Sequence, residues 1–341
     1  MKKKNLAMIG CGTVGQGLLR IIAEKKPDLN VVAISDKLKG AIFDPNGIDV
    51  SKMLDVLEND GKIEEYKSAS KKAITGLDPI ETIKNCNADI MAEMTYTDIE
   101  TGQPATSYIE TALEQGMHVT TSNKGPAALY HAKLAKLAAK NNVQFLIEGT
   151  VMSGTPVFNL ARETLTGCKI TEVKGILNGT TNYILTKMEN EGWSYNDALK
   201  KAQELGFAEA DPTADVEGFD ALAKVVILSN YLLEGNIKPD EVPRQGINEI
   251  SLENIRSAAE EGLRYKLIGS TKLEGESISA YVKPVKLDLS DPLAGVGGAT
   301  NALTFNTDLL GEVTIQGPGA GKIETGFSIF VDIMTILRQD S

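Results

Sequence analysis

The sequence predicts an α/β protein in which a doubly wound parallel sheet is followed by a second, mixed α/β domain. The first 150 residues alternate short apolar runs with helical patterns, which is typical of parallel strands covered by helices. A glycine-rich segment separates the first predicted strand from the first predicted helix. After Gly149, alternating apolar segments favour a mixed or antiparallel sheet. The 341 residues are enough for two hydrophobic cores.

The strands predicted in the first domain are, in order, Leu6–Ile9, Val31–Ile34, Asp89–Met94, His118–Thr121 and Val143–Ile147. Helical spacing of apolar residues predicts helices over Val14–Ile22, Tyr108–Gln115 and Ala127–Lys140. Residues 40–85 are richer in polar groups and turn signals, so we expect a helical excursion from the sheet. A last helix, from about Ile323 to Leu337, should complete this domain, which would comprise residues 1–150 and 318–341.

The second predicted domain comprises residues 151–317. Its predicted helices are Pro156–Leu165 and Asn182–Glu191, and its predicted strands are Lys169–Leu177, Ser279–Leu287 and Leu303–Ile315. A further helix should begin at Ser194, a good N-cap with Asp197 three residues on, and end at Gly206.

Composition excludes several classes of function. The net charge of −11 argues against a nucleic-acid partner, which would need a basic surface. No apolar run is long enough to span a membrane. Three cysteines, without metal-ligand spacing, predict free thiols in a reducing cytoplasm. With only two histidines, a histidine triad or zinc site is not expected, so acid–base chemistry must use lysine, carboxylate or water.

The glycine-rich segment is a GxGxxG match formed by Gly10, Gly12 and Gly15. Because it follows a strand and opens a helix, its glycines allow a tight turn, and the helix N-terminus offers N–H groups to a pyrophosphate. We therefore expect a Rossmann-type dinucleotide site here. The alternative is a purely structural turn between strand and helix.

Asp36 follows the second predicted strand, about twenty residues beyond the glycines, where an acid accepts hydrogen bonds from a free ribose 2′-hydroxyl. This favours NAD over NADP, because a 2′-phosphate would meet a like charge. Lys37 and Lys39 would pair with that phosphate if Asp36 turned away, so NADP stays open.

Two lysines stand out as candidate catalytic groups. Asp220 and Lys224 close the acidic stretch Gly206–Lys224 and, four residues apart, share a helix face. Lys124 lies in Thr120–Pro126, after a strand at the carboxyl edge of the parallel sheet, where open α/β folds bind ligands. The alternatives are a solvated ion pair and an exposed loop lysine.

Two further segments have the character of loops with a function. Glu148–Pro156 joins the two halves of the chain, and its small residues fit a hinge. Gly175–Asn182 ends a strand and starts a helix, so its N–H groups and hydroxyls are suited to a carboxylate, unless they merely cap the helix.

Taken together, these motifs resemble homoserine dehydrogenases. The resemblance covers nearly the whole chain through GCGTVG, TSNKGP, EGTVMSGTPV, GILNGTTNYIL, GFAEADPTADVEGFDALAK and GPGAGK. The segments Glu93–Asp98 and Glu100–Ala105 look like the compact branch common in archaea. Because the sequence ends at Ser341, we expect no ACT regulatory domain and no threonine inhibition through one.

The resemblance implies the reversible NAD(P)-linked reduction of L-aspartate 4-semialdehyde to L-homoserine. Lys124 and Lys224 would be the principal catalytic residues, joined by Asp220 in proton handling. The substrate's amino group would be held by Glu209 and Asp215, and the residues lining the pocket would be Gly179 and Thr180. The residues contacting the cofactor would be Gly10, Gly12, Thr13, Val14, Gly15, Asp36, Thr95 and Gly321.

The resemblance also implies that the second domain binds the substrate, carries out catalysis and forms a homodimer. It implies a sodium site as well. The sodium ion would order the hinge, mostly through backbone carbonyls, at Glu148, Val151, Ser153 and Thr155. Two other functions stay open: another small NAD(P)-dependent oxidoreductase, such as an amino-acid dehydrogenase acting on aspartate, and a non-catalytic NAD(P)-binding sensor.

Overall fold

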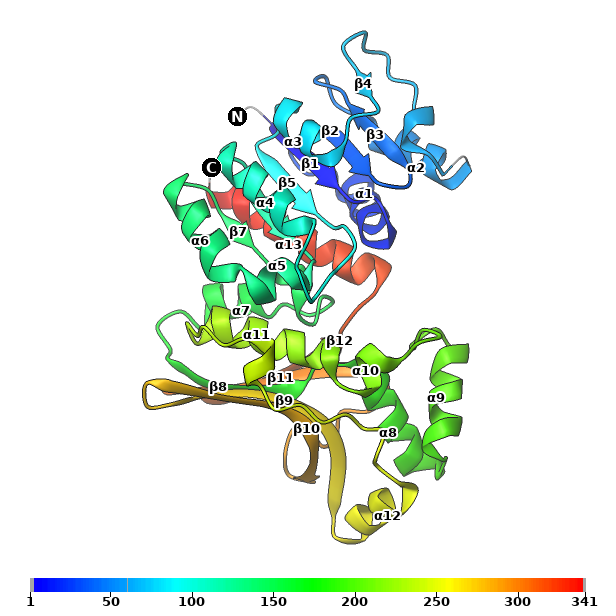
Figure 1. Ribbon diagram of the computed structural model, residues 1–341, viewed down its shortest axis with the longest axis vertical. Helices are drawn as coiled ribbons and strands as arrows, with labels where there is room; N and C mark the ends of the chain where they lie inside the picture. Colours follow the sequence, from blue (N-terminus) through cyan, green and yellow to red (C-terminus); the bar gives the residue numbers. More distant parts are fainter. Residues whose placement is uncertain (1–2, 60, 340–341) are drawn as a thin grey trace. The chain divides into compact units, whose positions relative to one another are not determined.

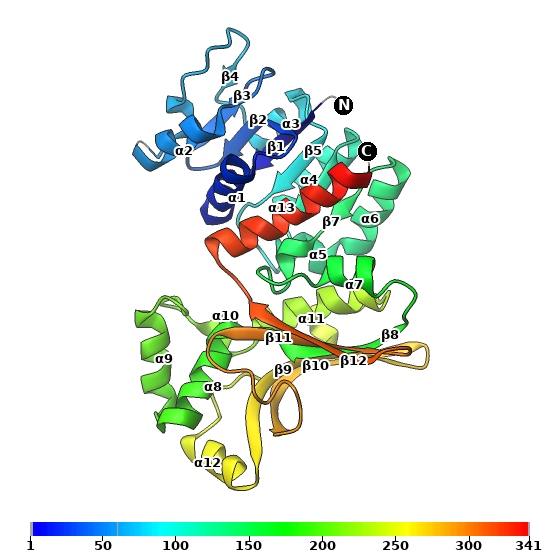
Figure 2. The same ribbon diagram turned by 180° about the vertical axis from the view of Figure 1, so that it is seen from behind.

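The computed structural model describes residues 3–59 and 61–339, which form two compact units (Figures 1 and 2). The first unit holds the chain up to Asn159 and again from Ala320, and the second holds Leu160–Gly319. The boundary at Asn159 lies within helix α7 (Phe158–Thr164). No helix among the described residues is long and apolar enough to cross a membrane.

The first unit is built on a seven-stranded sheet in the order β4-β3-β2-β1-β5-β6-β7. Its strands are β1 (Lys4–Ile9), β2 (Leu29–Asp36), β3 (Gly40–Phe43), β4 (Ile74–Thr75), β5 (Ile90–Glu93), β6 (His118–Thr121) and β7 (Phe145–Leu146). The strands from β2 to β7 in this order are parallel, and β3 and β4 add an antiparallel edge. The predicted Rossmann-type α/β class is thereby confirmed.

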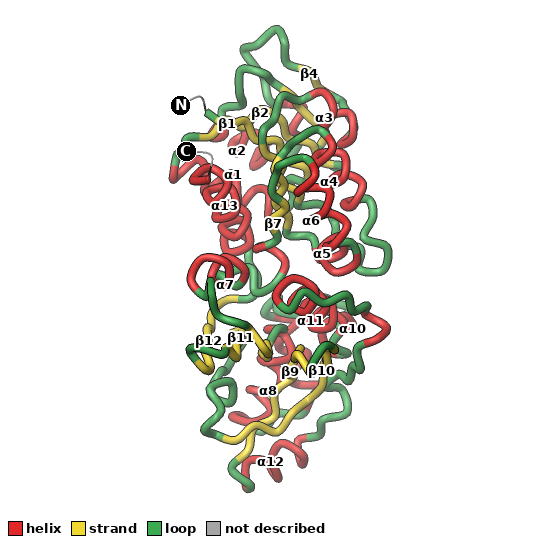
Figure 3. The backbone as a smooth tube through the Cα atoms, turned by 90° about the vertical axis from the view of Figure 1, so that its left-hand side faces the viewer, coloured by secondary structure: helices red, strands yellow, loops and turns green. Residues whose placement is uncertain are grey.

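Helices cover both faces of this sheet, which lies between them in Figure 3. They are α1 (Thr13–Lys25), α2 (Val50–Asn59), α3 (Pro79–Asn85), α4 (Ala105–Glu114), α5 (Lys124–Leu129), α6 (His131–Lys140) and α13 (Lys322–Gln339). Short 3₁₀ turns lie at Ile63–Glu65 and Glu148–Thr150. The apolar residues of α1, α13 and the central strands share one core, in which Leu6, Leu18 and Ile333 are fully buried.

Helix α13 is the last in the sequence, and it packs directly against the first. A Cβ at Gly17 would lie 1.9 Å from the carbonyl oxygen of Lys322, and a Cβ at Gly326 would lie 2.7 Å from the backbone nitrogen of Leu18. Glycine at both positions therefore lets the two backbones touch. This contact attaches the C-terminal helix to the unit that begins at the other end of the chain.

Two predictions for this unit are wrong. Residues 40–85 are not wholly helical, because Ala41 and Ile42 are buried as β3 pairs with β2, and β4 pairs with β3. The helix predicted over Ala127–Lys140 begins earlier, at Lys124, and is divided at Tyr130, whose φ of −131° is not helical. Apolar spacing alone revealed neither the pairing partner of β3 nor this break.

The second unit is built on an antiparallel sheet in the order β10-β9-β8-β11-β12. Its strands are β8 (Ile170–Ile176), β9 (Leu263–Glu274), β10 (Ser277–Asp288), β11 (Thr300–Thr307) and β12 (Gly311–Pro318). Its helices are α8 (Gly179–Glu191), α9 (Tyr195–Glu204), α10 (Thr213–Val216), α11 (Phe219–Leu232) and α12 (Leu252–Glu260), with a 3₁₀ turn at Pro239–Glu241.

The segment Leu303–Ile315, predicted as one alternating run, is in fact a hairpin of β11 and β12. Strand β9 was not predicted, because residues 266–271 are all buried and so lack an alternating pattern. The cap at Ser194 is confirmed, since its side chain accepts the N–H of Asp197 at 3.2 Å, and helix α9 ends shortly before Gly206.

Candidate active site

The glycine turn between β1 and α1 has the tight geometry that its sequence predicts. Gly10 has φ +96°, and its N–H donates to the carbonyl of Ser35 at 2.8 Å. A Cβ at Gly10 would lie 2.4 Å from the carbonyl oxygen of Met94, and a Cβ at Gly15 would lie 2.5 Å from that of Gly10. Glycine is therefore required at both positions by the fold itself.

Gly12 differs from these two glycines, because a Cβ there would meet nothing within 4 Å. It is the N-cap of α1, and no side chain caps this helix end. The N–H groups of Thr13 and Val14, in the first helical turn, have no intrahelical acceptor. Lys322 adds a positive charge beside the same turn, where its Nζ donates to Gln16 Oε1 at 3.1 Å. Open space, N–H donors and a cation suit a pyrophosphate.

Asp36 ends β2 beside the glycine turn. Its Oδ2 accepts the N–H of Cys11 at 2.8 Å, and its Oδ1 accepts those of Leu38 and Lys39 at 2.9 and 3.1 Å. These three N–H groups fix the carboxylate beside the glycine turn. Burial, with the charge of Asp36, raises the pKa of the Cys11 thiol to about 12, so this cysteine is a poor nucleophile.

Glu93, to which the sequence assigned no role, organises the carboxyl edge of the sheet. Its fully buried carboxylate accepts hydrogen bonds from the N–H of Thr95 at 2.8 Å, from the Thr95 hydroxyl, and from Thr121 Oγ1 at 2.7 Å. Burial raises the pKa of Glu93, and these hydrogen bonds oppose the rise. The carboxylate ties the segment after β5, which carries Thr95, to the last residue of β6, Thr121.

Lys124 is the first residue of α5, at the carboxyl edge of β6, and its side chain is partly buried. The preceding residue, Asn123, caps this helix by accepting the N–H of Gly125 at 3.2 Å and donates from Nδ2 to the carbonyl of Tyr96 at 3.0 Å. The backbone at Lys124 is therefore fixed by hydrogen bonds of Asn123 to Gly125 and to Tyr96.

In the hinge segment, the side chain of Glu148 caps a helix, a role that was not predicted. The buried carboxylate caps α7, accepting the N–H groups of Val157 at 2.5 Å, Phe158 at 3.1 Å and Asn159 at 2.6 Å. Ser153 Oγ pairs with Thr325 Oγ1 at 2.7 Å. No group of three metal-ligating His, Cys, Asp or Glu residues occurs in residues 3–59 and 61–339.

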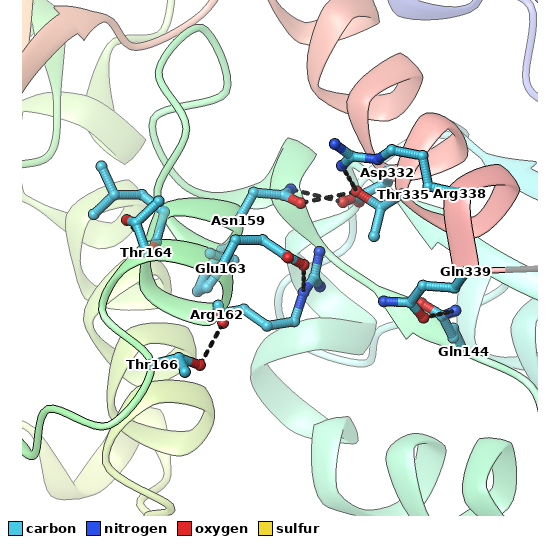
Figure 4. Close-up of polar contacts among 12 residues, drawn as sticks. Gln144, Asn159, Arg162, Glu163, Thr164, Thr166, Asp332, Thr335, Arg338 and Gln339 are labelled. Carbon is cyan, nitrogen blue, oxygen red and sulfur yellow. Dashed lines mark hydrogen bonds and ion pairs between the residues drawn. The ribbon is translucent and has the colours of Figure 1, made fainter.

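A second buried acid, Asp332 on α13, lies beside Asn159, as Figure 4 shows. It accepts hydrogen bonds from Thr120 Oγ1 at 2.8 Å, from the N–H of Glu148 at 3.1 Å and from Asn159 Nδ2 at 3.1 Å. Burial, followed by the charge of Glu148, raises the pKa of Asp332 to about 7. Thr335 also donates to Asn159 Oδ1 at 3.1 Å, so α13 holds the start of α7.

In the second unit, Asp220 and Lys224 lie one turn apart on α11, as their spacing predicts. Lys224 is only 8% exposed, and its Nζ donates to Asp220 Oδ2 at 2.7 Å and to the carbonyl oxygen of Leu177 at 2.6 Å. The alternative of a solvated surface pair is therefore wrong. An ammonium has three N–H donors, so one remains for a ligand.

Asn178 joins this pair to a further acid. Its Nδ2 donates to Asp215 Oδ1 at 2.6 Å and to Asp220 Oδ2 at 2.9 Å, while its Oδ1 caps α8 by accepting the N–H of Thr181 at 2.9 Å. Burial raises the pKa of Asp215, the hydrogen bond from Asn178 lowers it, and the charge of Asp220 raises it again. The cluster of Asn178, Asp215, Asp220 and Lys224 is thus a coupled polar site.

The other predicted substrate residues border this cluster or lie in the loop leading to it. Gly179 and Thr180 form the first turn of α8, and Thr180 Oγ1 donates to the carbonyl of Phe207 at 2.6 Å. Glu209 is exposed in the loop before α10. Of the side chains predicted for the amino-acid end, Asp215 is joined to Asp220 and Lys224 through Asn178. No site role was predicted for Asn178, although an asparagine before a helix start is a recognisable cap.

Two family models match the chain. That of homoserine dehydrogenase matches residues 156–334, and that of the glutamate/leucine/phenylalanine/valine dehydrogenases matches residues 1–179. The NAD(+)-dependent homoserine dehydrogenase of Pseudomonas canavaninivorans is 44% identical over 98% of this chain and 97% of its own length. The homoserine dehydrogenase of Methanocaldococcus jannaschii is 41% identical over 97% of this chain and 98% of its own.

A solved structure of similar size is that of a hyperthermophilic archaeal homoserine dehydrogenase in complex with NADPH. It is 33% identical, has a TM-score of 0.83, and is matched over 98% of each chain. The second family model stops at residue 179, whereas the relatives just described match from end to end. The chain therefore belongs to the homoserine dehydrogenase family of NAD(P)-dependent oxidoreductases.

Proposed function

We propose that the protein catalyses the reversible NAD(P)-dependent reduction of L-aspartate 4-semialdehyde to L-homoserine. The observation that carries the chemistry is the cluster of Asn178, Asp215, Asp220 and Lys224, in which Asn178 and Lys224 are buried and the two acids partly buried. The substrate has an ammonium, a carboxylate and an aldehyde. These groups need acids, N–H donors and a proton donor, and the second unit offers all three around the start of α8.

In this proposal Lys224 and Lys124 act at the aldehyde oxygen of the substrate. A nicotinamide cofactor, when bound, would supply or accept the hydride. Negative charge then grows on the substrate oxygen, and a fixed ammonium stabilises it in a buried site. Lys224 supports this role because two of its N–H groups are already used, which orients the third. Asp220 accepts one of these bonds, holds Lys224 in place and takes part in the proton exchange.

The substrate's ammonium is assigned to Asp215 and Glu209. Asp215 is partly buried and held by Asn178, so it presents a carboxylate of fixed orientation. Glu209, on the exposed loop before α10, would add the second charge. This division leaves the N–H groups of Gly179 and Thr180 for the carboxylate.

For the cofactor we favour NAD, bound over the glycine turn with its ribose on Asp36. The open space at Gly12 fits a pyrophosphate, and Thr95 and Gly321 would complete the site. A relative named NAD(+)-dependent supports this preference, whereas the related archaeal enzyme in complex with NADPH argues for NADP. We expect Asp36→Ala to lower kcat/KM with NADH relative to NADPH about tenfold, from the lost ribose bond. An unchanged ratio would remove Asp36 from this role.

We further propose a sodium ion in the hinge, a homodimer formed through the second unit and a cytoplasmic location. The carboxylate of Glu148 already accepts N–H groups at the start of α7. The sodium ion would therefore be bound by the backbone carbonyl oxygens of Glu148 and Val151 and by oxygen atoms of Ser153 and Thr155. Replacing sodium by choline should lower the melting temperature if the site exists. Light scattering should report twice the chain mass of 36.6 kDa.

The central test is absorbance at the nicotinamide band with homoserine and either cofactor. We expect turnover by the wild type, and Lys224→Ala should reduce kcat by about two to four orders of magnitude. Lys201→Ala is the matched control, because Lys201 is an exposed lysine of the same unit paired with Glu204. Near-normal rates in Lys224→Ala would refute its assigned role. A folded wild type without turnover would instead support a non-catalytic NAD(P) sensor.

A further inference from the structure

Asn301, near the start of β11, is a buried amide that the proposed chemistry leaves unused. Its side chain is 1% exposed, and no group among the described residues bonds to either its Oδ1 or its Nδ2. Leaving such a group without a partner costs about 1 to 3 kcal/mol. Buried amides in folded proteins nearly always have partners, so this one calls for an explanation.

The amide lies between two backbone segments that glycine allows to come close. A Cβ at Gly179 would lie 3.3 Å from Asn301 Oδ1, and a Cβ at Gly319 would lie 2.4 Å from the same atom. The side chain therefore faces the first residue of α8 on one side and the end of β12 on the other. Neither neighbour contributes a side chain that would satisfy the amide.

The start of α8 provides donors at the same place. This helix has 13 residues, and the Oδ1 of its cap, Asn178, accepts the N–H and the hydroxyl of Thr181. The N–H groups of Gly179 and Thr180 have no acceptor within the helix. They carry the positive end of the helix dipole, which favours an anion. The Asn301 amide, which carries further N–H donors at Nδ2, lies beside the first residue of this helix.

The surroundings hold Asn301 in place without using its amide. The carbonyl of the preceding Thr300 accepts Asn182 Nδ2 at 2.9 Å. Asn182 also accepts Lys266 Nζ at 3.1 Å, and that ammonium donates to the carbonyl of Val296 at 2.6 Å. The loop before Asn301 is therefore anchored to α8 and β9. A side chain fixed in this way is suited to recognition.

We propose that Asn301 is a specificity-determining residue whose Nδ2 donates to the α-carboxylate of the amino-acid substrate. It acts together with the N–H groups of Gly179 and Thr180. Asp215, linked to Gly179 through Asn178, accepts the ammonium on the neighbouring side. An α-amino acid carries its carboxylate and ammonium on one carbon, which matches donors placed beside an acid. This inference rests on the proposed function and adds a residue to it.

The test compares homoserine with 3-aminopropan-1-ol, which has the same alcohol and amine but no carboxylate. Asn301→Leu keeps the size of the side chain and removes its polar atoms. We expect KM for homoserine to rise about tenfold to a hundredfold, as for a lost hydrogen bond to a charged group. The kinetics with 3-aminopropan-1-ol should stay unchanged. Removing an unpaired buried amide should leave the melting temperature equal or higher.

Asn306→Leu is the matched control, because it lies on the same strand and its Nδ2 already bonds Glu172 at 3.4 Å. It should leave KM for homoserine unchanged. An unchanged KM in Asn301→Leu, or equal losses with both alcohols, would overturn the proposal by indicating a structural role. If the leucine variant does not fold, Asn301→Ala is judged by the same comparison.

Failure of the proposed function is separate from failure of this inference. A wild type that turns over no homoserine refutes the function. Calorimetric titration of homoserine into the protein with NAD then decides the inference. Weaker binding by Asn301→Leu than by wild type supports it, and equal binding, including none by either, overturns it.

Discussion

Replacing Lys266 by methionine should change how the stability of the second unit depends on pH. Lys266 is 2% exposed, and its Nζ donates to neutral oxygens of Asn182 and Val296. Burial lowers its pKa from 10.5 to about 8. The charge of Glu189 raises this pKa, and the charge of Arg264 lowers it. Below about pH 8 the folded protein therefore carries a poorly solvated cation.

The sign follows from proton binding. Between about pH 8 and 10.5 the unfolded lysine is protonated and the folded one is not, so this group makes the protein more stable as the pH rises. The difference between a pKa of 10.5 in the unfolded chain and about 8 in the folded protein corresponds to about 3.4 kcal/mol of unfolding free energy in total. Between about pH 7.5 and 10, some 2 kcal/mol of this should be measurable as the difference between wild type and Lys266→Met.

Urea unfolding followed by Trp193 fluorescence measures this difference, because Trp193 is the only tryptophan and lies in the second unit. Lys174→Met is a control of opposite sign. Burial lowers the pKa of Lys174, but the hydrogen bond and charge of Asp291 raise it overall. Its stabilising effect should therefore fade above about pH 10. A difference between wild type and Lys266→Met that does not change with pH would refute the reasoning.

Two further predictions concern the first unit. Gly17→Ala should lower the free energy of unfolding by about 1 to 3 kcal/mol, because its Cβ would lie 1.9 Å from the carbonyl oxygen of Lys322. Gly12→Ala should keep the melting temperature, because its Cβ would meet nothing within 4 Å, but it should weaken NAD binding. Equal melting temperatures for the two variants would contradict this. The pKa of Asp332, raised to about 7, means that its contribution to stability is present in acid and lost as the pH rises from about 4 to 7. Asp332→Asn should abolish that loss, seen by comparing thermal unfolding of variant and wild type at about pH 5 and 7.5. A loss of equal size in the variant would assign it to other groups.

Patterns of neighbouring residues in the sequence were sufficient to predict much of the secondary structure. The glycine turn, the parallel strands and the Ser194 cap depend on residues near one another in sequence, and each was predicted. The pairing of Asp220 with Lys224 is local too, since one helical turn separates them. What local pattern missed was strand β9, whose buried run has no alternation because both of its faces are covered.

By itself, then, the sequence determined the class of fold and the family, and it singled out the segments that we propose carry the chemistry. Only the tertiary structure decided what the buried polar groups do. Glu93 meets Thr121 from 28 residues away, and Asn178 meets Asp215 from 37. Asn301 is left unpartnered by a packing of distant glycines. A side chain's burial and partners depend on which remote segments fold against it, and no spacing along the chain records that.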